Sequence, residues 1–524
     1  MKKCALLAIF ALFMCLGMIS GCGSNGGSSD SKTISMALSN EPSSLDPAMT
    51  YGLSESDVEL AIFEGLTRAD EKGVAQPALA EKWDVSADGL TYTFHLRKDL
   101  KWSDGTPITA KDFEYSWKRV LDPQLASGNA YMLFIIEGAE DYNSEKGSAD
   151  KVGIKAVDDN TLQVKLVEPA AYFLDLTAFH AFYPVPKHTV EANKDGWAGN
   201  AETIVGNGPF KITKWTHSSE IILEKNENYW NPSVVASNSV RMPISESKST
   251  RLTMLESNQT DLIVDPPPAD EDRLKEKGLY KVEPQLGTSY YIFNVTKAPF
   301  DKVEVRKAFA MAVTRKDMIE KVVRNGKKAA NTFVPPGINV NGKDFAEETG
   351  SLVVEDPAQA KKILASSGYN GEPVTILYNT NEMNKAIAES IQAMWKDALG
   401  VNVELTNQET KVFYASRENG EYQVAAANWI ADFADPVNFL DIFTAKDNDA
   451  QYHNAEYNAI MKAVHKEVDP AKRAQLMHQA EKKLFDDCVI IPLYYTSQVI
   501  AVNPKLTGYY CSPTGVIDII KAHK

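Results

Sequence analysis

The sequence predicts a multidomain α/β protein. Three observations support this: the length, strand-like alternation in the first half, and a strand–helix–strand unit in the second. At roughly 100 to 200 residues per domain, a chain of 524 residues comprises two to four domains. Alternation predicts strands with one face in water, whereas strand, helix and strand with short connections predict a parallel sheet covered by helices. We therefore expect a strand-rich part followed by an α/β part.

The chain begins with a stretch typical of an export leader. Two lysines precede an apolar run from Cys4 to Ile19, which is shorter than the roughly 20 residues that a membrane-spanning helix needs. The leader, residues 1–21, ends in Ile19-Ser20-Gly21-Cys22, which resembles the lipobox of bacterial lipoproteins. The resemblance implies an acylated (palmitoylated) Cys22, with an ordinary secretory signal as the alternative. Residues 22–30 read as a flexible Gly/Ser tether.

Strands are expected in the first half of the mature chain. Apolar residues alternate with other residues from Thr33 to Leu38, from Tyr92 to Leu96 and from Leu162 to Leu166. A period of two in polar surroundings is typical of strands with one face in water.

The second half contains a βαβ pattern. Val374 to Tyr378 reads as a strand, Asn384 to Leu399 as an amphipathic helix, and Val401 to Leu405 as a second strand, with Gly400 ending the helix. Such a unit requires a parallel sheet with helices on its faces.

Two further helices have clear start signals. Asp356-Pro357 precedes a helix from Ala358 to Ala365, and Asp469-Pro470 precedes an amphipathic run that ends near Leu484. An aspartate at the cap accepts hydrogen bonds from free amides, and the fixed φ of proline suits the first helical position.

Charge and cysteine content exclude some classes of protein. The chain has 70 Asp and Glu against 55 Lys and Arg, a net charge of −15, so no basic surface for nucleic acid is expected. Beyond Cys22 only Cys488 and Cys511 remain; they either pair or are isolated core residues. Without a CxxC pair or a Cys/His cluster, no metal site is predicted.

The sequence contains no recognisable enzyme signature. The patterns G-x-S-x-G, H-E-x-x-H, Walker A and G-x-G-x-x-G are all absent, and the eight histidines are scattered. We therefore predict no catalytic residue, no cofactor and no enzymatic activity.

One carboxylate stands out by its surroundings. Asp432 lies between Ile430 and Phe433, just after a predicted strand from Gln423 to Ala427. Burying such a charge alone would cost several kcal/mol, so it needs donors or a cation. Either an internal group satisfies it, or the cation is a ligand ammonium.

The stretch from Ala80 to Trp117 resembles the signature block of the extracellular solute-binding proteins of the dipeptide/oligopeptide type. Many positions match at fixed spacing, including Lys101-Trp102-Ser103-Asp104-Gly105, which we interpret as a structural turn and core rather than as a binding site. Further landmarks recur along the chain: Ser44-Leu45-Asp46-Pro47, Phe63-Glu64-Gly65-Leu66, Gly206-Asn207-Gly208-Pro209-Phe210, Asn228-Tyr229-Trp230 and Trp429 with Asp432.

The resemblance implies a periplasmic-binding-protein-like fold with two α/β lobes, a hinge of two crossing strands and an inserted strand-rich domain. The first lobe would comprise residues 31–63, 187–286 and 498–524. The inserted domain would comprise residues 64–186, and the second lobe residues 287–497.

The resemblance also implies that an oligopeptide is held, extended, between the two lobes. Asp432 matches the carboxylate that pairs with the ligand's α-ammonium, and backbone groups of both lobes would bond the peptide main chain. For Arg417 a solvated helix charge is an equal alternative. The implied ligand-binding residues are Asp432, Trp429, Asn428, Ile430, Gly52, Leu53, Tyr290, Tyr291, Asn379 and Arg417.

Some positions depart from the enterobacterial type of receptor. Ala426 replaces an arginine and Asn384 a histidine, two groups that help to hold the C-terminal carboxylate of short peptides. Gly287 and Ile430 replace two bonded cysteines. We infer that this receptor is less committed to ligands of three residues.

The main hypothesis is thus a monomeric, lipid-anchored receptor on the outer surface of a Gram-positive cell membrane. It would deliver oligopeptides to the permease of an ABC transporter. Alternatives within the fold are receptors for a dipeptide, a peptide pheromone, a nickel chelate or an oligosaccharide. A secreted hydrolase or a surface interaction protein would belong to a different class.

Overall fold

The computed structural model describes residues 32–194, 196–324, 326–446 and 448–524. The expected leader, the tether and Cys22 lie outside these ranges. Within them, no helix combines the length and the apolar character needed to cross a membrane.

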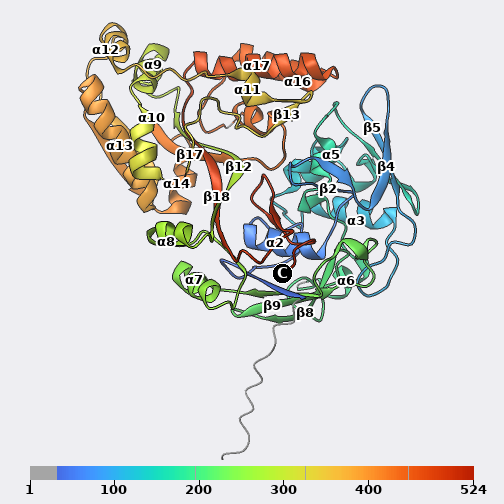
Figure 1. Cartoon of the computed structure of the whole chain (residues 1–524). Helices are drawn as coiled ribbons and strands as arrows, with labels where there is room; N and C mark the ends of the chain where they lie inside the picture. Colours follow the sequence, from blue (N-terminus) through green and yellow to red (C-terminus); the bar gives the residue numbers. More distant parts are fainter. Residues whose placement is uncertain (1–31, 195, 325, 447) are drawn as a thin grey trace, which may run out of the picture.

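A ten-stranded sheet extends through two lobes of the molecule (Figure 1). Strands from distant parts of the sequence are neighbours in it, as expected for a chain that crosses between lobes more than once. From one edge to the other the strands are β16 (Val403–Gln408), β15 (Val374–Asn379), β17 (Val424–Ile430), β12 (Tyr280–Phe293), β18 (Ile490–Val502), β11 (Leu262–Val264), β1 (Thr33–Ala37), β10 (Ser239–Pro243), β9 (Glu220–Lys225) and β8 (Phe210–Thr216).

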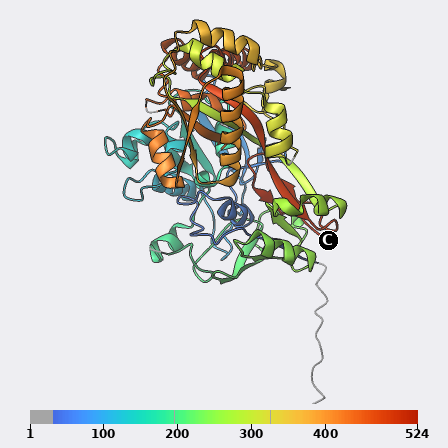
Figure 2. The same cartoon turned by 90° about the vertical axis from the view of Figure 1, so that its left-hand side faces the viewer.

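The two longest strands, β12 and β18, form the hinge. They pair antiparallel from Tyr280–Ala501 at one end to Ile292–Ile490 at the other, but the register shifts between Pro284 and Thr288 and again between Ser289 and Tyr290. A shift of register interrupts the ladder and bends the strands. In Figure 2 both strands pass from the upper lobe to the lower one, so we expect the lobes to rotate against one another at this interrupted stretch.

The second lobe contains the predicted βαβ unit. β15 and β16 are parallel, with Val374 opposite Val403. The helix between them is α13 (Glu382–Leu399), which begins at the cap residue Asn381 and ends at Gly400 in the left-handed conformation (φ 75°). The prediction of strand, helix and strand is confirmed.

Helices cover this half of the sheet, and a separate helical layer completes the lobe. Phe300, Phe309 and Trp395 pack edge to face in the core between sheet and helices. The remaining elements of the lobe are α9 (Val303–Met311), α10 (Arg315–Met318), α11 (Phe345–Thr349), α12 (Pro357–Ser366), α14 (Thr410–Glu418), α15 (Val437–Leu440), α16 (Ala455–Lys466), α17 (Pro470–Asp486), β13 (Asn339–Val340) and β14 (Lys343–Asp344).

Both predicted helix caps are confirmed. The Asp356 carboxylate accepts a hydrogen bond from the backbone N–H of Gln359 at the start of α12. The Asp469 carboxylate accepts from Ala471 and Lys472 at the start of α17.

An inserted strand-rich body lies at the right of Figure 1. The Ala80–Trp117 block supplies two strands of its four-stranded antiparallel sheet and continues through a loop into a helix. Trp102 is buried and Gly105 has φ 89°, which confirms a core residue followed by a turn. The elements are β2 (Thr67–Ala69), β3 (Ala75–Pro77), β4 (Ala80–Val85), β5 (Thr91–Leu96), β6 (Ile154–Asp158), β7 (Thr161–Lys165), α3 (Ala110–Val120), α4 (Ala139–Asn143) and α5 (Phe173–Leu176).

A tight contact anchors the first lobe to the start of this body. The side chain of Asn207 accepts a hydrogen bond from the N–H of Glu64 at 3.0 Å and donates one to its C=O at 2.9 Å. Gly208 lies against Ile62, so that an added Cβ would be 2.5 Å from its carbonyl carbon. The other elements of the lobe are α2 (Leu53–Ile62), α6 (Lys187–Ala192), α7 (Lys248–Glu256), α8 (Glu271–Glu276), β19 (Tyr510–Cys511) and β20 (Ile517–Asp518).

The two cysteines of the described chain are both free. Cys488 lies just after α17, and Cys511 in β19, where its thiol donates to the side chain of Gln498. Burial raises the pKa of Cys488 to about 11 and that of Cys511 to about 12. The alternative of two isolated, partly buried cysteines therefore describes this structure.

Candidate functional site

An unpaired strand edge lies beside the hinge, in the last part of β17. On one side β17 pairs with β12 along its length, from Val424 to Ile430. On the other side β15 reaches only Val424 and Ala425. The edge from residue 427 to residue 430 therefore has no partner strand in the described chain.

The free edge presents backbone groups in a regular pattern. Ala431 donates its N–H to Leu286 on the β12 side. Because alternate residues of a strand direct their backbone groups to opposite sides, Ile430 and Asn428 direct theirs away from β12. An extended ligand can pair with these groups as an added strand.

The structure corrects one predicted boundary at this edge. Asn428, Trp429 and Ile430 were expected after the strand, but they are its last residues. Pairing with β12, in which Gly287 lies opposite Ile430, keeps the backbone extended. A partner so distant in sequence leaves no local signal.

Asp432 lies just beyond the free edge. Its backbone N–H and its Oδ2 both contact the amide of Asn438, at 3.3 and 3.4 Å, and the hydroxyl of Tyr131 donates to Oδ2 at 3.5 Å. These long, neutral contacts are the partners that the described structure gives it. Burial raises the pKa of Asp432, and the two side-chain donors only partly offset this. Among the described residues, none therefore gives this carboxylate a compensating cation.

Asn438 also fixes the neighbouring tryptophan. The indole N–H of Trp429 donates to Asn438 Oδ1 at 2.8 Å. One amide thus positions both Trp429 and Asp432, while Ile430 remains 36% exposed.

The first lobe presents Gly52 and Leu53 at the beginning of α2. Gly52 is the cap residue, with extended backbone, and lacks a capping side chain. Leu53 and its neighbour Tyr51 are 44% and 65% exposed, so both side chains are accessible to a ligand. The hydroxyl of Tyr51 accepts a hydrogen bond from Gly128 of the inserted body at 2.8 Å.

A cavity of about 240 Å³ in the second lobe brings together five of the expected residues. Ala426 and Asn384 line it too. The five are Tyr290, Tyr291, Asn379, Arg417 and Asn428.

The polar groups of this cavity are only partly satisfied. Asn379 Oδ1 accepts from Asn384 at 2.5 Å, but the buried hydroxyl of Tyr291 has no partner in the described structure. Arg417 Nε lies 2.7 Å from Asp449 Oδ2, and its guanidinium lies over the ring of Tyr414. Arg417 is therefore neither a solvated charge nor a free one.

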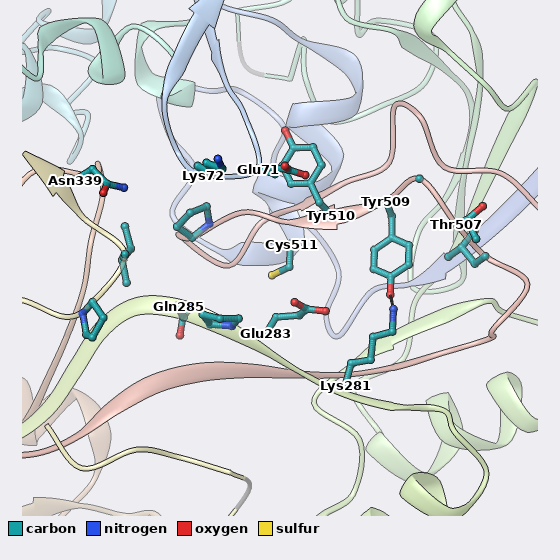
Figure 3. A pocket seen from close by; sticks show the side chains of 17 residues that line it. Glu71, Lys72, Lys281, Glu283, Gln285, Asn339, Thr507, Tyr509, Tyr510 and Cys511 are labelled. Atoms are coloured by element: carbon teal, nitrogen blue, oxygen red, sulfur yellow. Dashed lines mark hydrogen bonds between the residues drawn. The ribbon is translucent and has the colours of Figure 1, made fainter. Parts of the chain in front are cut away.

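A second cavity, of about 720 Å³, lies at the hinge (Figure 3). The β2–β3 turn, strand β12, the loop before β13 and the C-terminal segment converge on it. Lys281 donates to the hydroxyl of Tyr509 at 2.8 Å. Gln285 lines both cavities. None of the expected ligand residues lines this one, so the smaller cavity is the candidate ligand pocket.

Sequence reasoning missed three residues of the site. Tyr131 comes from the inserted body, far away in sequence. Asn438 lies six residues after Asp432, and an amide so close to an isolated carboxylate could have indicated its partner. Lys327 lines the smaller cavity and gave no signal, because nothing in its local sequence places it there.

Two lobes joined by shared strands, with an open strand edge and an uncompensated carboxylate beside the hinge, define a receptor that closes over an extended solute. The chain belongs to the bacterial extracellular solute-binding proteins, family 5, whose model matches residues 74–451. These proteins bind solutes and are not enzymes.

Curated relatives cover nearly the whole chain. The dipeptide-binding protein DppE of Bacillus subtilis is 38% identical over 504 residues, which cover 95% of this chain and 92% of DppE. The oligopeptide-binding protein OppA of the same organism is 36% identical over 535 residues, with 99% and 98% covered.

Solved structures show the same fold. The murein tripeptide-binding protein MppA in its unliganded open form has a TM-score of 0.81 at 33% identity, covering 94% of this chain and 97% of its own. OppA of Haemophilus influenzae in complex with the peptide RPPGFSPFR has a TM-score of 0.75 at 33% identity, with 94% and 98% covered.

Proposed function

We propose that this protein captures oligopeptides between its two lobes and delivers them to the permease of an ABC importer. One observation carries the proposal: in the described structure Asp432, a partly buried carboxylate without a cation, lies at the end of an unpaired strand edge. A peptide supplies both missing partners, because its α-ammonium compensates the charge and its extended main chain pairs with the edge.

The binding mode follows from these groups. The ammonium contacts Asp432 beside Tyr131, and the peptide backbone bonds to Asn428 and Ile430. Gly52 and Leu53 approach from the first lobe when the hinge closes. Since hydrogen bonds to the peptide main chain do not depend on its side chains, the protein should bind peptides of many sequences.

We also propose the domain bounds given above. The change from the first to the second lobe, at residues 286 and 287, coincides with the register shift of β12 between Pro284 and Thr288. The return at residues 497 and 498 falls on β18 close to the same shift. Residues 64–186, the proposed inserted domain, precede both crossings and interrupt the first lobe between residues 63 and 187.

For location, we propose acylation of Cys22, anchoring on the outer face of a Gram-positive membrane, and a monomeric state. The lipobox-like sequence and the Gly/Ser tether support the anchor. Mass spectrometry of the membrane-extracted protein is expected to find an acylated N-terminal cysteine. An unmodified N-terminus beyond Cys22 would contradict it.

Calorimetry on purified protein tests the function. Alanine peptides of two to six residues are titrated, with an oligosaccharide and a nickel chelate as controls, and native mass spectrometry identifies co-purified ligands. We expect the protein to bind the peptides and neither control. Peptides longer than three residues should bind at least as tightly as the tripeptide. Tight binding of the sugar or the chelate, with no peptide bound, would reject the proposal.

A further inference from the structure

The smaller cavity contains two cations, and no carboxylate is among the residues that line it. Arg417 is compensated by Asp449. The ammonium of Lys327 donates to the backbone C=O of Ser497 at 2.9 Å and lies 5.9 Å from the ring centroid of Tyr494. In the described structure Lys327 thus has a dipole and an aromatic face as partners, and no anion.

Burial makes this arrangement unfavourable in the empty cavity. It lowers the pKa of Lys327 to about 8, and the opposing effect of Asp265 is smaller. Asp265 itself is paired with Lys248. A desolvated cation without a counter-ion is costly, and an anion beside it would remove that cost.

Three hydroxyl groups that line the same cavity as Lys327 add to the case. Tyr291 Oη, Thr496 Oγ1 and Ser497 Oγ all line the cavity, are buried, and have no hydrogen-bond partner in the described chain. Buried polar groups without partners are rare. An ammonium and three unpaired hydroxyl donors around one space form a site for a compact oxyanion.

We propose that Lys327 holds a carboxylate of the bound ligand in this cavity, which makes it a specificity-determining residue; the proposal rests on the peptide-binding function. Asn428 belongs both to the free edge and to the cavity wall, so a peptide that starts at Asp432 and follows the edge reaches the cavity. At about 3.3 Å per residue, its fourth or fifth residue arrives there. Ala426 and Asn384, which share the cavity, are uncharged.

A carboxylate of a peptide has two sources, its C-terminus and an acidic side chain. Calorimetry with three pentapeptides distinguishes them: all-alanine with a free C-terminus, the same peptide as its C-terminal amide, and an amide with glutamate as the last residue. For the wild-type protein we expect at least one of the two carboxylate peptides to bind at least 10-fold more tightly than the all-alanine amide. Equal affinities for all three would overturn the inference.

Two substitutions of neighbouring lysines give a matched comparison. Lys327→Met is expected to weaken the favoured carboxylate peptide about 10- to 100-fold and to leave the all-alanine amide unchanged. Lys328→Met removes an exposed charge next to it and is expected to change neither. An equal loss for acid and amide would assign Lys327 a structural role and overturn the inference, as would unchanged binding.

Two further outcomes keep the test decisive. If Lys327→Met does not fold, Lys327→Arg takes its place; because it retains the charge, it should still prefer the carboxylate peptide to the amide. The comparison of acid with amide on the wild-type protein then decides whether a carboxylate is bound. If wild-type protein binds none of the three peptides, the proposed function itself fails. Binding of all three with equal affinity refutes only the role of Lys327.

Discussion

Tyr131 and Asp432 are separated by 301 residues in sequence, yet the tyrosine hydroxyl donates to Asp432 Oδ2 at 3.5 Å. The contact joins the inserted body to the second lobe. It is long, and both donors to this carboxylate are neutral. The contact therefore leaves the charge of Asp432 available to a ligand, and a peptide ammonium is the group that best completes it.

Replacing Asp432 tests this directly. Asp432→Asn keeps the shape and removes the charge, so peptides with a free N-terminus should bind more weakly by about 2 kcal/mol or more, at least about 30-fold. Calorimetry provides the measurement. The N-acetylated peptide, which has no ammonium, is the control. Its affinities for wild type and for Asp432→Asn should be nearly equal. A variant as tight as wild type for the free peptide would exclude an ion pair here.

The same group predicts a pH dependence of binding. Burial raises the pKa of Asp432 in the free protein, and the peptide ammonium requires the ionised carboxylate. Peptide affinity should therefore be constant at neutral pH and fall as the pH drops through this raised pKa. Asp432→Asn should abolish the dependence. A profile shared by wild type and variant would point to another titrating group.

Glu481 gives a pH dependence of stability instead. It is fully buried, accepts hydrogen bonds from the N–H groups of Phe333 and Val334, and burial raises its pKa to about 7. Between roughly pH 4.5 and 7 the folded protein retains a proton on Glu481 that the unfolded chain releases. The contribution of Glu481 to the free energy of unfolding therefore falls as the pH rises through that window.

Substitution by glutamine should remove the effect. Glu481→Gln retains an acceptor for both N–H groups, and its free energy of unfolding at pH 8 should exceed that of wild type by about 1 to 3 kcal/mol. Denaturant unfolding at pH 5 and 8 measures it. The exposed Glu418→Gln is the control, with no expected change. An equal pH slope in wild type and Glu481→Gln would contradict the prediction.

A glycine of the first lobe should be intolerant of substitution. An added Cβ at Gly208 would lie 2.5 Å from the carbonyl carbon of Ile62 and 2.6 Å from the N of Phe63. Backbone atoms cannot move aside cheaply, so Gly208→Ala should lower the free energy of unfolding by about 3 kcal/mol. At Gly199 the nearest atom is 3.5 Å away, and Gly199→Ala should be nearly neutral. Equal melting temperatures for both variants would refute the argument.

Local signals predicted much of the fold. The βαβ unit and the caps at Asp356 and Asp469 follow from residues a few positions apart, and all are observed. The end of β17 was placed too early because its pairing with Gly287 comes from elsewhere in the chain. Tyr131 and Lys327 were missed for the same reason: only the folded chain places them beside the ligand groups.

The open edge of β17 has a consequence for the protein without ligand. Ala427 to Ile430 is a short strand edge with a tryptophan and an exposed isoleucine, and such edges also accept strands from other protein molecules. Phe433, just beyond the edge, stacks on Tyr172 of the inserted body, with the two ring centroids 4.7 Å apart. This contact keeps the inserted body beside the edge. We expect this contact to hinder pairing of the edge with a second receptor molecule, so loss of the ring stack should favour self-association of the empty receptor.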